Sequence, residues 1–177
     1  MSLTVVNGLP VHVLIVHVVV VFVPLSSLAA VVGAIWPSAA RRMGVVLPLL
    51  ALVTLASVPL ATEAGEWLEG RVDSNALVRK HTELGDGLLP WAAALFVLAT
   101  AIWWTTRRSA AAESRPGRSR AAGSRSSLAL RIVAAVLCAG VAAGAVVEVY
   151  RIGDSGARAA WHDSFSQSSK PHQETND

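Results

Sequence analysis

Four long runs of apolar residues, separated by short polar segments, dominate the chain. They cover residues 9–36, 43–62, 87–106 and 128–150, and the third run is expected to be the inner part of a helix that begins near His81. About 20 apolar residues are needed to cross a hydrocarbon core of about 30 Å, and helices satisfy their own backbone hydrogen bonds there. The pattern therefore predicts an all-α fold, an integral membrane four-helix bundle.

Composition agrees with lipid as the solvent, because 53% of the residues are hydrophobic and only 15% are charged. The transmembrane domain is expected to occupy residues 1–162. The segment 107–127 is rich in Ala, Ser, Gly and Arg and has no apolar period, so a disordered loop is predicted there. Residues 163–177 are predicted to be a disordered polar tail.

Basic residues are unevenly distributed among the polar segments, and this predicts the orientation. The connections after the first and third runs, together with the start of the fourth run, hold nine arginines and one acid. The opposite side holds six basic residues and eleven acids. Loops rich in arginine stay in the cytoplasm by the positive-inside rule, so both termini are expected outside the cytoplasm.

The location of the arginines also decides which partners are expected. Anionic lipids are expected at the arginine-rich loop, because such headgroups attract basic segments beside a span. A loop that only sets the topology is the alternative. Nucleic acid is not expected as a partner, because no aromatic side chains are interleaved with these arginines for base stacking.

The fourth run is rich in small residues, and Gly140 and Gly144 have the spacing that allows helices to approach closely. This face is expected to pack inside the bundle, with a homodimer through the fourth span as the alternative.

Several ionisable residues lie near the predicted outer side of the spans. Such groups are costly within a membrane and usually face a bundle interior or water. The histidines and carboxylates near this outer side are candidates to bind a haem or a metal ion. The candidate cofactor ligands are His12, His17 and His81, and the candidate metal ligands are Glu63, Glu66, His81, Glu148 and Asp154.

The histidines of the first span limit how a site can be built. Five residues separate His12 from His17, so their rings lie about 140° apart around a helix and cannot share one small ion from one face. We therefore expect His17 and His81 to line one pocket, with Glu63 and Glu66 beside them. The group bound there is either haem b, through histidine ligation, or a divalent metal, which His12, His81 and one of the two glutamates could hold.

Two other functions remain open. One is a proton- or ion-handling protein with Glu148 and His17 as a buried titrating pair. The other is a structural or assembly protein without chemistry. The segment Gly153-Asp-Ser-Gly matches the tetrapeptide around a protease nucleophile, but it directly follows a span, and that chemistry needs a buried His and Asp. The chain carries no motif that assigns a catalysed reaction.

Four segments, taken in order, resemble a known bacterial family of predicted membrane proteins, domain of unknown function 2231. They are Asn7-Gly-Leu-Pro-Val-His with His17, Pro59-Leu-Ala-Thr-Glu-Ala-Gly-Glu-Trp, His81-Thr-Glu-Leu-Gly, and Gly153-Asp-Ser-Gly-Ala-Arg-Ala-Ala-Trp. The resemblance implies a four-span protein of the bacterial plasma membrane without an established activity. Asp154 stands where the family pattern often carries a histidine, and an oxygen ligand there would favour harder ions.

The predicted orientation is testable by labelling of introduced cysteines. Ser74→Cys should react with an impermeant maleimide in spheroplasts, whereas Ser119→Cys should react only after the membrane is permeabilised. The opposite labelling pattern would refute the orientation.

Overall fold

The structure is a computed structural model that describes residues 5–6, 9–71, 76–113 and 124–161. A two-residue antiparallel pair, β1 (Val5–Val6) with β2 (Leu9–Pro10), precedes the first helix. All other regular structure in the described residues is helical, so the all-α prediction is confirmed. The helices are α1 (Val11–Ile35), α2 (Pro37–Met43), α3 (Val46–Glu69), α4 (Ala76–Asp86), α5 (Leu88–Glu113) and α6 (Ser124–Trp161).

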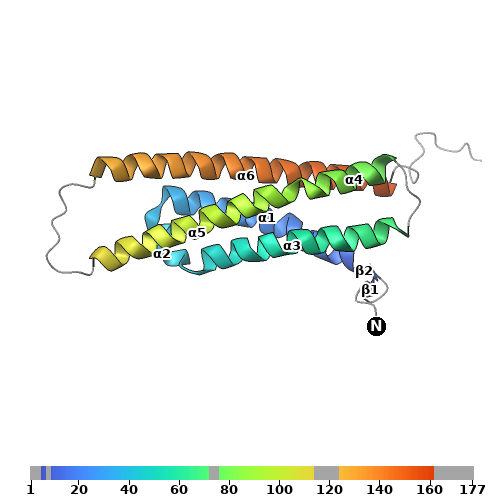
Figure 1. The fold of residues 1–177 in the computed structure, drawn as a ribbon, viewed down its shortest axis with the longest axis horizontal. Coiled ribbons are helices and arrows are strands. Elements are labelled where there is room, and N and C mark those ends of the chain that lie inside the picture. The colour runs from blue at the N-terminus through green and yellow to red at the C-terminus, as the bar shows by residue number, and fades with distance from the viewer. Residues whose placement is uncertain (1–4, 7–8, 72–75, 114–123, 162–177) are drawn as a thin grey trace, which may run out of the picture.

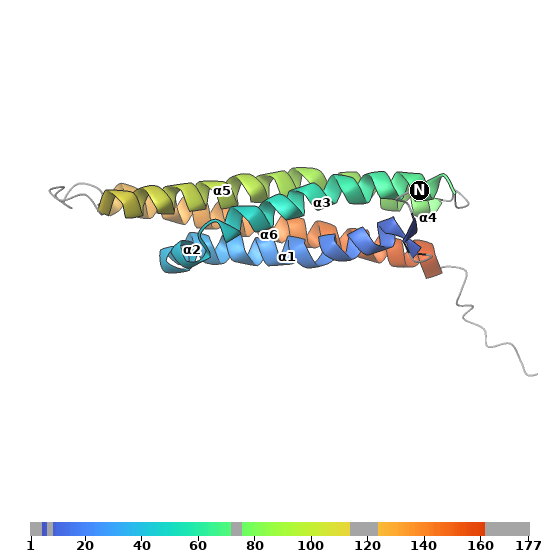
Figure 2. The same cartoon turned by 90° about the horizontal axis from the view of Figure 1, so that it is seen from below.

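The long helices lie side by side along one axis (Figure 1, Figure 2). In the described part of the chain, four helical stretches are long and apolar enough to cross a membrane: Val11–Ile35, Val46–Glu69, Ala76–Ala112 and Arg131–Trp161. Their outward surfaces expose large apolar side chains, among them Leu28 at 62% and Val136 at 65%. Water would penalise so much exposed apolar surface, whereas lipid does not. The protein is therefore a multi-pass membrane protein.

The two ends of the bundle differ in chemistry, and each is named here by its residues. The histidine end holds His12 at the start of α1 and His81 in α4, on the right of Figure 1. The arginine end lies around α2, on the left. It is defined by five arginines whose side chains are described: Arg41, Arg42, Arg107, Arg108 and Arg131.

The interior consists of two apolar clusters with a polar link between α1 and α3. One cluster includes Val23 and Leu95, and the other includes Leu47 and Cys138. The Oγ atom of buried Ser26 lies 2.6 Å from Thr54 Oγ1, and Thr54 also donates to the carbonyl of Leu50, 2.9 Å away. Polar side chains that pair in this way hold transmembrane helices together without leaving unsatisfied groups in hydrocarbon.

Helix α6 packs antiparallel to the α4–α5 pair along a seam where a glycine allows close approach. A Cβ atom at Gly144 would lie 2.3 Å from the ring of Trp91, so only glycine fits there. A Cβ atom at Gly140 would have no neighbour within 4 Å. Four residues advance a helix by about 400°, so the two glycines are offset by about 40° around α6. Gly144 therefore faces the bundle and Gly140 lies in open space, which corrects the prediction that both glycines pack inside.

The helices around the predicted disordered loop are longer than expected. Residues 107–113 belong to α5 and residues 124–127 belong to α6, so both helices extend into the segment where a loop was predicted. Alanine and arginine are strong helix formers, and extending an existing helix needs no new nucleation. Residues 114–123 and the predicted tail, 163–177, lie outside the described residues.

The two glycines of α6 give a matched test of the seam. Gly144→Leu should lower the stability of the bundle by about 1–3 kcal/mol or more, because the added side chain must displace Trp91. Gly140→Leu should leave the stability close to that of the wild type. Thermal unfolding in detergent measures both. Equal effects of the two substitutions would contradict this packing.

Candidate ligand site at the histidine end

Two imidazole rings from different helices face each other at the histidine end. The ring centroids of His12 and His81 are 6.3 Å apart, and the ring planes are close to perpendicular at 87°. Both side chains are half-buried. The helices bring together residues that are 69 positions apart in the sequence, in a part of the bundle where ionisable groups need partners.

Helix α3 holds the His12 ring. Nδ1 of His12 lies 2.9 Å from the carbonyl oxygen of Ala61. A carbonyl can only accept a hydrogen bond, so Nδ1 must carry the proton. One turn further along α3, Gly65 leaves room for the ring, because a Cβ atom there would lie 3.1 Å from His12 Cε1. Helix α3 thus supplies both the acceptor and the space for the ring.

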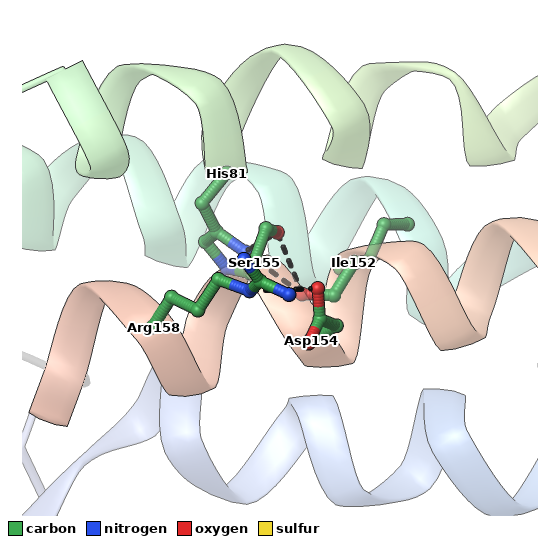
Figure 3. A network of polar contacts seen from close by, with 5 residues as sticks. All are labelled: His81, Ile152, Asp154, Ser155 and Arg158. Atoms are coloured by element: carbon green, nitrogen blue, oxygen red, sulfur yellow. Dashed lines mark hydrogen bonds and ion pairs between the residues drawn. The ribbon is translucent and has the colours of Figure 1, made fainter. Parts of the chain in front are cut away.

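Helix α6 holds the His81 ring in the same manner (Figure 3). Nδ1 of His81 lies 3.2 Å from the carbonyl oxygen of Ile152 and 3.0 Å from Ser155 Oγ. The Ser155 hydroxyl donates to the Ile152 carbonyl at 2.8 Å, so its oxygen is free to accept from Nδ1–H. A Cβ atom at Gly156 would lie 3.0 Å from His81 Cε1, so glycine again provides the space.

These contacts leave one nitrogen of each ring available. With the proton on Nδ1, the neutral form of each ring carries a lone pair on Nε2. No hydrogen-bond partner of either Nε2 atom is found among the described residues. An imidazole that ligates a metal typically has this arrangement, in which the second ring nitrogen donates to a carbonyl or hydroxyl and fixes the ring.

The expected pairing of His17 with His81 is not what the structure forms. The His17 side chain is exposed, and its Nδ1 lies 2.6 Å from the carbonyl oxygen of Val13 in its own helix. His12 takes the place beside His81. Because the two α1 rings point in directions about 140° apart, only one of them can face the bundle, and it is His12. The predicted titrating pair of Glu148 and His17 is joined by no contact among the described residues: Glu148 lies beside Gly87 at the α4–α5 junction, and the His17 side chain is exposed.

No hydrogen bond or ion pair among the described residues joins a candidate carboxylate to either ring. Glu63 and Glu66 are exposed on α3, and Glu63 lines a hollow of about 350 Å³ together with Asp86. Glu148 pairs with its neighbour Arg151 at 3.2 Å, and the Asp154 carboxylate pairs with Arg158 at 2.9 Å.

These positions bear on the predicted metal site. Within the described ranges, no three His, Cys, Asp or Glu side chains gather into a group that could hold a metal ion. The expected mononuclear site of His12, His81 and Glu63 or Glu66 is therefore not assembled among them.

The comparisons with known proteins place the chain in a family. Residues 8–168 match the family model described as predicted membrane protein (DUF2231). The chain belongs to this family. No curated protein and no solved structure matches the chain. Family membership confirms the resemblance seen in the sequence and, like it, assigns no activity.

The residues that position the two rings lie in or beside the segments that carry the resemblance to DUF2231. The residues that position the rings were not predicted from the sequence as site residues: Ala61, Gly65, Ile152, Ser155 and Gly156. The sequence does carry a spacing that could have indicated them. Ala61 and Gly65 are one helical turn apart and so share a helix face, as do Ile152 and Gly156. The Gly153-Asp-Ser-Gly tetrapeptide, set aside as a protease motif, supplies the serine and the glycine that hold His81.

The space at His81 can be tested with two glycines of one helix. Gly156→Ala should reduce the stability of the bundle by about 1–3 kcal/mol, because its methyl group meets the His81 ring. Gly153→Ala meets nothing within 4 Å, so it should be neutral or stabilising by about 0.5–1 kcal/mol as a helix-interior substitution. Thermal unfolding in detergent shows which of the two variants is more stable. A Gly156→Ala variant that is as stable as Gly153→Ala would show that the His81 ring does not pack there.

Proposed function

We propose that His12 and His81 are the axial ligands of a b-type haem at the histidine end, and that the protein carries single electrons in the membrane. The ring pair is the observation that carries this proposal. Metal–nitrogen bonds of about 2.0–2.1 Å place two imidazole centres roughly 6 Å apart when they bind opposite sides of one metal. The observed centroid distance is 6.3 Å, and perpendicular ring planes are compatible with ligands on opposite sides.

The number of available ligands favours haem over a bare ion. A protein site for a single transition metal normally supplies three or four ligands, whereas a porphyrin supplies four nitrogens and needs only axial ligands from the protein. The two imidazoles of His12 and His81 match the second case. Nowhere in the described chain does a third or fourth ligand join them, which disfavours a site for a single metal ion held by the protein alone.

The helix that carries His81 bears on how a macrocycle would fit between the rings. Helix α4 has no fully buried residue, and elements with few buried contacts are those that open locally, which would make room for the group. Exposed Arg79 and Lys80 directly precede His81 and suit the carboxylates of the haem propionates. When bound, haem supplies the exchange of one electron with carriers outside the chain. The protein orients the rings through Ala61, Ile152 and Ser155, and the hydrogen bonds that Nδ1–H donates increase the basicity of the ligands.

A structural role is the second candidate, and the same hydrogen bonds favour it. His12 ties α1 to α3 through Ala61, and His81 ties α4 to α6 through Ile152 and Ser155. Polar links of this kind contribute about 0.6 kcal/mol each on average within membranes. On this view the histidines hold the helix ends together, and the free Nε2 atoms have no role.

A visible absorption spectrum of the purified protein separates the two candidates. Wild-type protein should show a Soret band and α and β bands that sharpen on reduction, as expected for iron with two imidazole ligands. His12→Ala and His81→Ala should each lose these bands, or convert them to those of iron with one histidine ligand, while the helix content by circular dichroism is retained. His17→Ala is the matched control and should keep the spectrum, because its ring faces away from the bundle.

Two results would overturn the haem proposal. One is wild-type protein that is colourless and takes up no added haem although it is folded. The other is a spectrum that persists in the double variant His12→Ala, His81→Ala. Lower thermal stability of both single variants, in a protein that binds no haem, would support the structural role instead.

A further inference from the structure

Two arginines at the histidine end have carboxylate partners, whereas Arg71 there lies over the ring of Trp67, with its guanidinium carbon 3.6 Å from the ring centroid. At the histidine end, Arg151 pairs with Glu148 at 3.2 Å and Arg158 pairs with Asp154 at 2.9 Å. For the five arginines that define the arginine end, no ion pair with a described carboxylate is found. Among the described side chains, some charges at the histidine end are thus neutralised by carboxylates, whereas the exposed arginines of the arginine end have no carboxylate partner and are accessible to anions outside the bundle.

The contacts of these arginines orient their side chains but do not neutralise them. The guanidinium of Arg107 lies 5.5 Å from the ring centroid of Trp103, and that of Arg108 lies 4.7 Å from the ring centroid of Trp104. Nη2 of Arg131 donates to the carbonyl oxygen of Ile35, 3.3 Å away, at the last residue of α1. Each contact fixes a planar fork of N–H donors and leaves most of these donors free.

The arginines lie at the level where the lipid-facing surface ends. Trp36 is 55% exposed and Trp104 is 48% exposed, and indole rings favour the boundary between hydrocarbon and headgroups. Ile132 and Val133, which directly follow Arg131, are exposed apolar residues. Helix α2 packs against α1 and α5, so its exposed Arg41 and Arg42 cover the same end of the bundle. At this level the phosphates of the lipid headgroups are the nearest abundant anions.

We infer that the arginine end is a binding site for anionic phospholipid headgroups, formed by the helical arginines of α2, α5 and α6. Phosphate oxygens accept paired hydrogen bonds from a guanidinium fork, which suits a headgroup held between neighbouring arginines. Nucleic acid fits less well, because the rings of Trp103 and Trp104 are already covered by guanidinium groups and border the lipid-facing surface. The inference is independent of the haem proposal, because no residue is shared between the two ends.

Native mass spectrometry of the full chain tests the inference. The protein is released from mixed micelles that contain equal amounts of phosphatidylglycerol and phosphatidylcholine, and the lipids that remain bound are counted. Wild-type protein should retain phosphatidylglycerol in preference. The double variants Arg107→Gln, Arg108→Gln and Arg41→Gln, Arg42→Gln should each lose this preference, roughly fivefold for each arginine removed. The variant Arg107→Lys, Arg108→Lys keeps both charges and should keep most of the preference.

The double variant Arg151→Gln, Arg158→Gln is the matched control, because it removes the same charge from the histidine end. Its lipid preference should equal that of the wild type. An equal loss in this control would overturn the inference in favour of a net-charge effect, as would an unchanged preference in both test variants. Displacement of the lipid by an equal concentration of inorganic phosphate would show a general anion site rather than a headgroup site. Thermal unfolding in a neutral detergent should confirm that every variant is folded before the lipids are counted.

Discussion

The close approach of α6 to the α4–α5 pair is the contact on which the histidine end depends. Along this antiparallel seam, glycine stands opposite a large side chain three times: Gly156 faces His81, Gly87 faces Glu148, and Gly144 faces Trp91. Lipid provides no hydrophobic force between helices, so association depends on close van der Waals contact and on hydrogen bonds between helices. The glycines allow the close van der Waals contact. The same approach brings His81 to the Ile152 carbonyl and the Ser155 hydroxyl, with which it forms the hydrogen bonds between helices.

The polar side chains of the bundle differ in how much of their hydrogen-bonding capacity is used. Thr54 bonds to Ser26 and to the preceding turn of its own helix, and His17 bonds to the carbonyl of Val13. Neither interaction points to a ligand. His12 and His81 differ from His17 because their rings are neighbours and each bonds to the carbonyl of another helix, with no partner of either Nε2 atom among the described residues. A pair of lone-pair donors held in fixed orientation is suited to an electron-accepting partner such as a metal, and simple helix locking does not require it.

The ends of the bundle also separate two kinds of chemistry. Side chains at the histidine end are bonded to backbone carbonyls of neighbouring helices, so the ring positions depend on the bundle being folded. At the other end, the guanidinium groups of Arg107 and Arg108 lie over tryptophan rings, and Arg131 donates to the last carbonyl of α1. These arginine side chains are exposed. The polar side chains of the two ends therefore differ in what positions them: carbonyls of neighbouring helices at the histidine end, and tryptophan rings with a helix terminus at the arginine end.

The sequence alone determined the fold class, the four spans and the level of the ionisable groups, because crossing hydrocarbon requires long apolar helices whatever their neighbours are. Helical geometry also required that His12 and His17 point in different directions. Only the tertiary structure decided that His12 faces His81, that Gly144 rather than Gly140 lies inside, and that Glu63 and Glu66 remain exposed. Spacing within one helix gives relative angles but not which face meets a neighbour. That choice depends on how glycines and large side chains of different helices fit together, so it emerges only when the helices are packed.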